Sequence, residues 1–291
     1  QAFWHEQKKG QTIETPYGDV VHLDLRHLGE SRIDERLPMV RDLALSYMGV
    51  DPVHDLIPVR PVVHYTMGGI DTDIDGATRL QGLFAAGECA CVSINGANRL
   101  GSNSLTELLV FGSRAGRGAA RLAAASPAPD LSDLRAQARR AEERVRALFR
   151  KAGGRESIPG LRQEMNDAME SGAGIYRSNE TLSASAAAVK SLRRRYADVA
   201  LGDRSNVYNT DLIQLLELGA MLDVAEAIVV SALERGESRG SHQRLDFAGR
   251  DDENYLKHSL AYYSTTGDPE IRYRDVTITK SQPAERVYGG A

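Results

Sequence analysis

The sequence predicts a mixed fold: an α/β portion, then an α-helical bundle, then a small α+β C-terminal portion. A short apolar strand, a Gly-rich loop and a helix follow one another within residues 63–116. Apolar residues recur at helical spacing in four segments between residues 130 and 233. Residues 271–279 alternate well enough between side-chain types to predict a strand.

Residues 1–58 predict a mixed segment with one strand and one helix. Val20, Leu23 and Leu25 are strand-like. Residues 35–48 have helical spacing and end at Gly49, after which several prolines interrupt regular structure. The histidines of this segment lack the spacing of metal ligands, so we interpret them as surface or structural residues: His5, His22, His27 and His54.

The α/β portion centres on a strand–loop–helix unit. Residues 82–86 are too short for a helix and predict a buried strand, with Glu88 at its end, where open α/β sheets place ligand-contacting groups. A Gly-rich loop with Arg99 follows, and then a helix over residues 105–116 with Asn103 or Ser104 as N-cap. The positive end of that helix suits an anion or an electron-rich ring.

Each of these features also has a structural explanation when taken singly. A Gly-rich turn between strand and helix is usually only a turn, and a single buried Arg usually pairs with an acid. A lone histidine such as His64 is more often structural than catalytic. Within one strand–loop–helix unit, however, the features form a more specific pattern that favours a ligand site.

Four helices are predicted after a linker at residues 123–130. Ser132 would cap the first, whose apolar residues are spaced by four, three, four and three, as in a bundle seam. The second begins at Pro159 and the third at about Thr181. The fourth, residues 211–233, is apolar almost all round, which predicts burial on several sides. The seam residues are Leu134, Ala138, Ala141, Val145 and Leu148.

Two charged clusters in this half admit more than one interpretation. The arginines at 193–195 predict a solvated helix face and not a nucleic-acid patch. His242 lies among Arg239, Arg244 and Asp246, which could form an acid/base cluster or an ion network. We favour a network that pins the helical part against the α/β part.

Composition excludes several classes of protein. The 291 residues are 42% hydrophobic and 26% charged, the profile of a soluble globular protein, and the net charge of −4 gives no support for nucleic-acid binding. No apolar run approaches the ~20 residues needed to span a bilayer. Cys89 and Cys91 are the only cysteines, too close for an ordinary bridge and too few for a metal cage. They predict reduced thiols in a cytosolic protein. The chain starts at Gln1 without a signal or transit segment, which we interpret as a cut inside a larger protein.

The motifs HYTMGG, GLFAAGEC and GANRLGSNSL closely resemble the flavoprotein subunit of fumarate reductase and succinate dehydrogenase. The resemblance is closer to the quinol:fumarate reductase type. It continues through SNVYNTDL, ESRGSHQRLD, RDDENYLKH and ITKSQPAERVYGG, and so covers essentially the whole chain. The chain in turn covers about the C-terminal half of the family.

The resemblance implies a division into four domains. Residues 1–58 would be the end of an α+β capping domain with its return segment. Residues 59–122 would be the C-terminal part of an incomplete, Rossmann-like FAD-binding domain. Residues 130–233 would form the helical bundle domain, and residues 234–291 the small α+β C-terminal domain.

The resemblance also implies an activity: interconversion of fumarate and succinate by hydride transfer with FAD in anaerobic respiration. His64 and Arg99 match the substrate-binding residues of the family. The residues that match its flavin contacts are Gly87, Glu88, Ser104 and Leu105. The proton-donating Arg and the His that attaches FAD covalently precede the matched region. We therefore expect no catalytic residue, no metal site and no activity in this chain alone.

The partners implied are an iron–sulfur subunit and membrane anchor subunits, which would hold the protein at the cytoplasmic face of the membrane. Asn95 stands where the family usually has His, and Asn cannot titrate near neutral pH. No GxGxxG motif opens a βαβ unit here. The alternatives are a non-catalytic interaction module, or a succinate dehydrogenase or aspartate oxidase of the same family. Fumarate reduction and succinate oxidation share one transition state, so the direction depends on the potentials of the redox partners.

Overall fold

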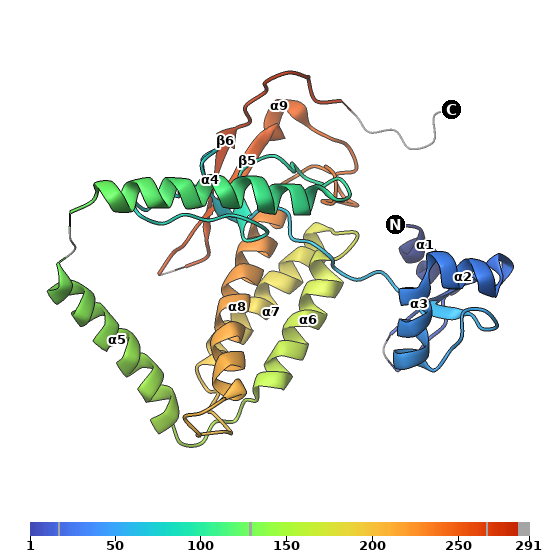
Figure 1. The fold of residues 1–291 in the computed structure, drawn as a ribbon, viewed down its shortest axis with the longest axis horizontal. Coiled ribbons are helices and arrows are strands. Elements are labelled where there is room, and N and C mark those ends of the chain that lie inside the picture. The colour runs from blue at the N-terminus through green and yellow to red at the C-terminus, as the bar shows by residue number, and fades with distance from the viewer. Residues whose placement is uncertain (17, 128–129, 266, 285–291) are drawn as a thin grey trace. The chain divides into compact units, whose positions relative to one another are not determined.

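The computed structural model describes residues 1–16, 18–127, 130–265 and 267–284. The chain divides into two compact units, Gln1–Tyr65 and Thr66–Ala291 (Figure 1). Residues 128–129 of the predicted linker, and the end of the motif ITKSQPAERVYGG from residue 285, lie outside the described residues.

The first unit pairs two short strands antiparallel, β1 (Val21–Leu23) and β2 (Ile57–Val59), which confirms the strand predicted near Val20. Its helices are α1 (Ala2–Lys8), α2 (Glu30–Arg36) and α3 (Pro38–Leu43), which continues into a π turn, Ala44–Met48. The helix predicted over residues 35–48 is confirmed from Pro38 to Met48, but its predicted start at residue 35 is wrong, because α2 ends at Arg36. Pro38 has no N–H to continue α2, so it opens a new helix instead. The helical segment ends at Gly49, as predicted, and Gly49 has the left-handed conformation.

The second unit begins with a parallel pair, β3 (Ile70–Asp71) and β4 (Ala90–Cys91). The strand predicted at residues 82–86 is wrong: this segment makes only an isolated bridge, between Phe84 and Ala77. That bridge is antiparallel and pairs one residue on each side, whereas a strand needs a ladder of several such pairs. The helix α4 (Asn103–Ala125) follows, with Ser102 as its N-cap and not Asn103 or Ser104.

Three helices form the bundle: α6 (Ile158–Ala173), α7 (Asn179–Tyr196) and α8 (Thr210–Glu234). Pro159 lies in the first turn of α6, as predicted, and Leu161, Val189 and Leu218 are fully buried between the helices. Apolar residues lie on every face of α8, but not every face of this helix is buried. Ile213 and Val224 are 53% and 54% exposed.

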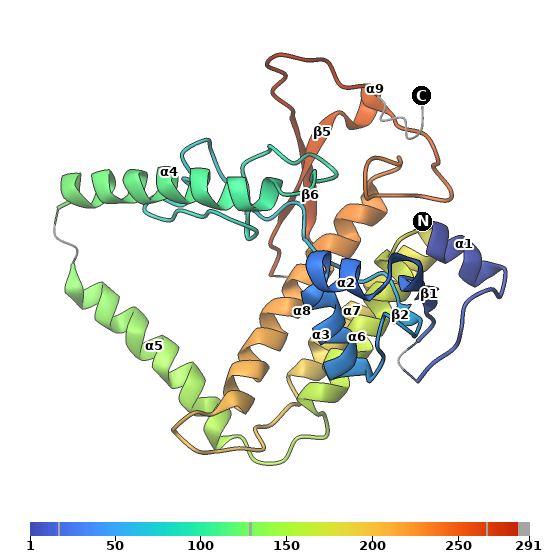
Figure 2. The same cartoon turned by 45° about the vertical axis from the view of Figure 1, so that its right-hand side comes forward.

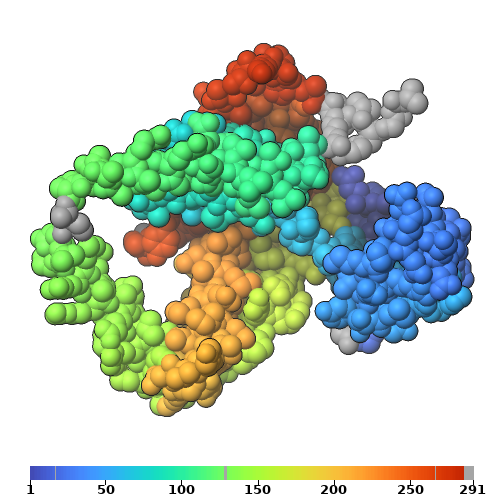
Figure 3. All heavy atoms as spheres, in the orientation of Figure 1, coloured from blue at the N-terminus to red at the C-terminus, as the bar shows by residue number. Residues whose placement is uncertain are grey.

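The helix α5 (Leu131–Arg150) does not join the bundle along its length, so the predicted seam is wrong. None of its residues is buried, and only Leu148 and Phe149 pack against the bundle core. Figures 1 and 2 show α5 standing apart from α8 except near its C-terminal end, and the space-filling view in Figure 3 agrees. Its N-cap is Asp130, whose side chain accepts from the Ser132 N–H.

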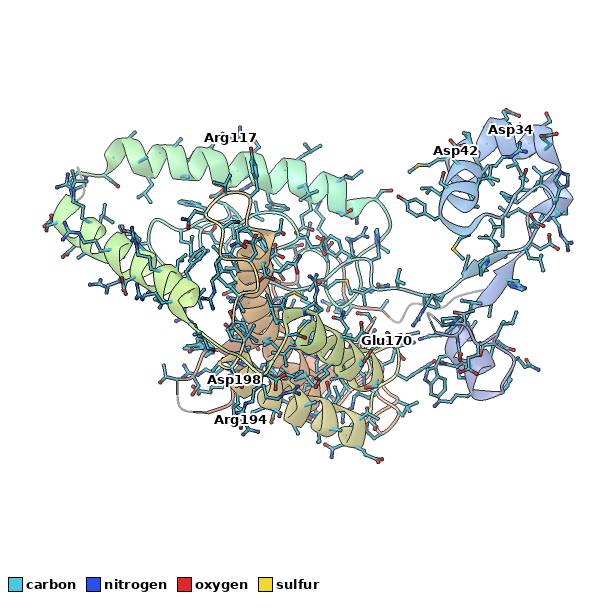
Figure 4. The ribbon with its side chains drawn as sticks, turned by 90° about the horizontal axis from the view of Figure 1, so that it is seen from below. Asp34, Asp42, Arg117, Glu170, Arg194 and Asp198 are labelled. Atoms are coloured by element: carbon cyan, nitrogen blue, oxygen red, sulfur yellow. The ribbon has the colours of Figure 1, made fainter. Side chains whose placement is uncertain are left out.

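The arginines of α7 behave differently from one another. Arg193 pairs with Asp223 and Glu226 of α8, and Arg195 pairs with Glu156 and Glu164. Only Arg194, labelled in Figure 4, is exposed as predicted. The solvated-face prediction is therefore wrong for Arg193 and Arg195, which join α7 to neighbouring segments. These pairs orient the helices while Leu161, Val189 and Leu218 supply the buried apolar area.

The C-terminal part contains α9 (Asp252–Tyr255) and an antiparallel pair, β5 (Lys257–Tyr262) and β6 (Glu270–Asp275). β6 confirms the strand predicted from residue 271, although it ends at Asp275. β5 was not predicted. Among the described residues, no helix is both long and apolar enough to cross a membrane.

Candidate functional site

Glu88 lies in the turn before β4 and is exposed. Its Oε1 accepts a hydrogen bond of 2.8 Å from the Thr66 N–H, at the start of the second unit. The backbone near Thr66 and the turn approach closely: a Cβ on Gly69 would lie 2.5 Å from the Cys89 carbonyl oxygen. A carboxylate has two oxygens, so Glu88 can also accept from a ligand hydroxyl.

Gly87 adopts φ +89°, and a Cβ there would lie 2.6 Å from Cδ2 of Leu108 on α4. The positive φ favours glycine, because residues with a side chain rarely adopt this backbone conformation, and a Cβ here would also displace the end of the Leu108 side chain. The turn with Glu88 is thereby packed directly on the first turns of α4.

The N-terminus of α4 supplies backbone donors. The helix is 23 residues long, and its first turn carries no acidic side chain that would neutralise its positive end. Ser102 enters the helix with φ +65° and makes no side-chain capping bond. Ser104 is half-buried, and Leu105 is 66% exposed. Backbone N–H groups at such an end suit the carbonyl oxygens of a flavin ring or an anion.

Residues 92–102, called here the Arg99 loop, join β4 to α4 and contain no helix or strand. The Arg99 side chain is half-buried, and its Nη1 donates to the Leu100 carbonyl at 3.0 Å. A guanidinium keeps its charge at every ordinary pH and can bind a carboxylate with two parallel hydrogen bonds. The loop therefore presents a fixed positive charge next to the positive end of α4.

His64 is exposed and lies one residue before the end of the first unit, Gln1–Tyr65. Arg99, Gly87, Glu88, Ser104 and Leu105 all belong to the second unit. Five of the six predicted site residues thus belong to the second unit, and His64 belongs to the first.

Asn95 has a partner that the sequence did not reveal. Its Nδ2 donates a 2.6 Å hydrogen bond to Oε2 of Glu107, which is only 2% exposed on α4. Glu107 occupies the buried face of α4, four residues before Phe111 and eight before Ala115. The spacing of Glu107 from these two apolar residues places it on the same helix face, so the sequence offered this one signal of a buried acidic residue.

Behind the loop, residues 235–252 form an ion network centred on Glu237, which is fully buried. Glu237 accepts from Nε of Arg235 at 2.9 Å, from Nε of Arg239 at 2.8 Å and from the Asp251 N–H at 2.9 Å. Burial opposes ionisation of this carboxyl, but the bonds from Arg239, Asp251 and Arg235 outweigh it and lower its pKa. The glutamate is therefore held charged.

His242 is part of the same network and is held neutral. Arg177 can only donate, so its 2.9 Å contact makes Nδ1 of His242 the acceptor, and Nε2–H donates to the Arg235 carbonyl at 3.1 Å. Burial, together with the nearby guanidinium groups, lowers the pKa of His242 to about 4. Nearby, Arg244 donates to the Ala232 and Leu233 carbonyls at the end of α8.

The network also reaches the α/β part. The Ala97 carbonyl, in the Arg99 loop, accepts from both the N–H and the hydroxyl of Ser241, at 2.9 and 2.8 Å. The predicted ion network is confirmed within residues 235–252, but its ion pairs stay inside that segment, and the contact with the α/β part is made by the uncharged Ser241. No group of three or more His, Cys, Asp or Glu side chains in the described part of the chain could hold a metal ion.

Comparison with known proteins identifies similar chains. The family described as "Fumarate reductase flavoprotein C-term" matches residues 162–288, and "FAD binding domain" matches residues 1–105. The fumarate reductase flavoprotein subunit of Mycobacterium tuberculosis H37Rv is 56% identical over 99% of this chain and 50% of its own length. That of Escherichia coli K12 is 52% identical over 100% of this chain and 48% of its own length.

Solved structures show the same similarity. Escherichia coli quinol fumarate reductase matches with a TM-score of 0.94 and 52% identity, over 100% of this chain and 50% of that one. An adenylylsulfate reductase of Archaeoglobus fulgidus, at 19% identity and a TM-score of 0.60, shares the fold alone. The chain spans about half the length of the curated relatives it matches. It belongs to the fumarate reductase flavoprotein family, a family of FAD-dependent oxidoreductases, and corresponds to the C-terminal half of its quinol:fumarate reductase type.

Proposed function

We propose that this chain supplies substrate-binding and flavin-binding groups to an FAD-dependent fumarate reductase that interconverts fumarate and succinate. The observation that carries the proposal is the Arg99 loop, which presents a guanidinium beside the positive N-terminus of α4. Fumarate and succinate are small dicarboxylates, and negative charge builds up toward one carboxylate during reduction. Donors that are already in place stabilise that charge at little reorganisation cost.

Each site residue has a role in this proposal. Arg99 binds one substrate carboxylate through its planar fork, and His64 supplies a second hydrogen bond to the substrate. Glu88 accepts from a ribityl or ribose hydroxyl of FAD, while Gly87, Ser104 and Leu105 contact the flavin through the turn and the start of α4. The donor set fits FAD, because it combines an acceptor for sugar hydroxyls with N–H donors for ring oxygens. Bound FAD supplies the hydride chemistry.

We assign the finer organisation on the same basis. Residues 1–58 are the end of a capping domain, 59–122 the Rossmann-like part of the FAD-binding domain, 130–233 the helical domain and 234–291 the C-terminal domain. In the whole protein, the proton-donating Arg and the His that attaches FAD lie in the other half. An iron–sulfur subunit and membrane anchor subunits hold that protein at the cytoplasmic face of the membrane in anaerobic respiration.

The test uses a flavoprotein in which the N-terminal half of the Mycobacterium tuberculosis relative is joined to this chain. Malonate, a dicarboxylate that cannot react, is titrated while the flavin absorbance is followed. We expect saturable binding that weakens about 100-fold or more in Arg99→Lys, because the fork geometry is lost. His64→Ser should also weaken binding, and both variants should keep their flavin.

Arg117→Lys is the matched control, since Arg117 lies exposed on α4 (Figure 4). It should bind malonate as the unaltered protein does. Wild-type malonate affinity in Arg99→Lys would remove Arg99 from the substrate site. A joined protein that folds but takes up no flavin would favour the interaction-module alternative.

A further inference from the structure

The Arg99 loop is fastened at every second residue before Arg99, each time by a different element. We propose that Ser93, Asn95 and Ser241 are positioning residues that hold Arg99 in register for a substrate carboxylate. The inference rests on the proposed function of Arg99. The three fastened residues are 93, 95 and 97. Ile94 and Gly96 lie between them and are exposed, as is Asn98 next to Arg99.

The first contact ties the loop to the C-terminal sheet. Ser93 Oγ lies 2.8 Å from Nε2 of His258 on β5. Ser93 has φ +72°, a conformation that glycine adopts without strain. A serine in this conformation is strained, and the hydroxyl contact to His258 offsets that strain.

The second contact ties the loop to α4. Asn95 donates to Glu107, and this bond gives a buried carboxylate a hydrogen-bond donor. The bond also fixes the distance between the loop and the helix whose N-terminus follows Arg99. Loss of the amide would leave the Glu107 oxygen without this donor, which is costly for a buried polar atom.

The third contact ties the loop to the ion network. Ala97 lies two residues before Arg99, and its carbonyl accepts two hydrogen bonds from Ser241. Gly240, with φ +59°, permits this approach, because a Cβ there would lie 2.5 Å from the Ala97 oxygen. The turn itself is closed by the Arg239 N–H, which donates to the His242 carbonyl at 2.8 Å.

These contacts matter because the loop has no helix or strand of its own to fix its shape. An Arg–carboxylate fork is sensitive to placement, and a displacement of about 1 Å in a binding group can cost about 100-fold in rate. The C-terminal part of the chain therefore affects substrate binding indirectly, because its residues Ser241 and His258 hold the loop that carries Arg99.

The experiment combines three substitutions in the joined flavoprotein: Ser93→Gly, Asn95→Ala and Ser241→Ala. Ser93→Gly removes the hydroxyl while suiting the positive φ, and Ser241→Ala removes one of two bonds. Each single variant should weaken malonate binding about 3- to 10-fold, and the triple variant more than any single one. Asn95→His restores a ring donor for Glu107 and should recover most of the affinity that Asn95→Ala loses.

Tyr208→Gly is the matched control, since Tyr208 also has a positive φ but lies 96% exposed in the segment before α8, outside the Arg99 loop. It should bind malonate as wild type. A second measurement follows hydrogen–deuterium exchange of amides 94–100 in the 291-residue chain itself, where the triple variant should exchange faster.

If Arg99→Lys weakens malonate binding while the triple variant keeps wild-type affinity and exchange, the inference is overturned. If Arg99→Lys itself leaves binding unchanged, the proposed function fails, and so does the positioning role that rests on it. Faster exchange together with weaker binding in the triple variant supports the positioning role.

Discussion

Replacing His242 by Gln should remove a specific part of the acid sensitivity of this chain. Gln can accept from Arg177 with its oxygen and donate to the Arg235 carbonyl with its nitrogen, as the neutral ring does. Gln does not titrate, so the variant keeps both hydrogen bonds and loses only the ionisation.

The direction of the pH effect on stability follows from the linkage between folding and protonation of His242. The pKa of His242 is lowered from an ordinary 6.5 to about 4 by burial, and the guanidinium groups of Arg177, Arg244 and Arg235 add to the effect. Above pH 6.5 the ring is neutral in both the folded and the unfolded chain. As the pH falls from 6.5 toward 4, the unfolded chain takes up the proton first, so the folded state loses stability over that window.

The magnitude follows from the same two values. A tenfold difference in proton affinity corresponds to about 1.4 kcal/mol, so an upper limit of about 2 kcal/mol is lost between pH 8 and pH 5. Partial solvent exposure of the ring reduces this to about 1 to 2 kcal/mol. The pKa of His258 is also lowered by burial, so part of the pH dependence should persist in His242→Gln.

The assay is urea unfolding of the 291-residue chain at pH 8 and pH 5, for the wild type and for His242→Gln. The difference in free energy of unfolding between the two pH values should be about 1 to 2 kcal/mol smaller in the variant. His22→Gln, at an exposed position, is the control and should keep the wild-type difference. Equal pH dependence in His242→Gln and the wild type would refute the account of a buried neutral ring.

Two further pairs of variants test the packing around the site. Glu237→Gln should lower the free energy of unfolding by about 3 kcal/mol, because the half-buried guanidinium groups of Arg235 and Arg239 lose this counter-charge and only Arg239 also pairs with Asp252. Glu234→Gln at an exposed position should change it little. Chemical denaturation compares the two, and equal effects would contradict the network. Gly76→Ala should destabilise by about 1 to 3 kcal/mol, because its φ is +76° and the new Cβ would lie 2.7 Å from the Ala115 Cβ. Gly116→Ala, in open space on α4, should stabilise by about 0.5 to 1 kcal/mol, and thermal unfolding that ranks these two alike would count against the packing described here.

Sequence reasoning located the elements whose signals are local. Pro159 marks the start of α6, Gly49 marks the end of the π turn after α3, and alternation marks β6. Sequence reasoning failed where the packing of a helix depends on which other segments of the chain cover it. The spacing of α5 shows an apolar stripe but not what covers it, and α8 is apolar all round although Ile213 and Val224 are exposed.

The site shows the same division. The sequence motifs predicted Arg99 and Glu88 as site residues, because both lie in motifs that resemble the family. The contacts of the Arg99 loop were not predictable, because they join residues far apart in the chain. Ser241 and Ala97 are 144 positions apart, and Ser93 and His258 are 165 apart. No local pattern encodes such pairings, which arise only when the C-terminal part packs on the loop.

The most direct test of the central claim is fumarate reduction by the joined flavoprotein, with reduced viologen as electron donor. The account predicts turnover in the joined protein, none in the 291-residue chain alone, and a kcat/KM at least ~100-fold lower for Arg99→Lys with its flavin retained. Turnover by the chain alone, or wild-type kcat/KM in Arg99→Lys, would contradict it.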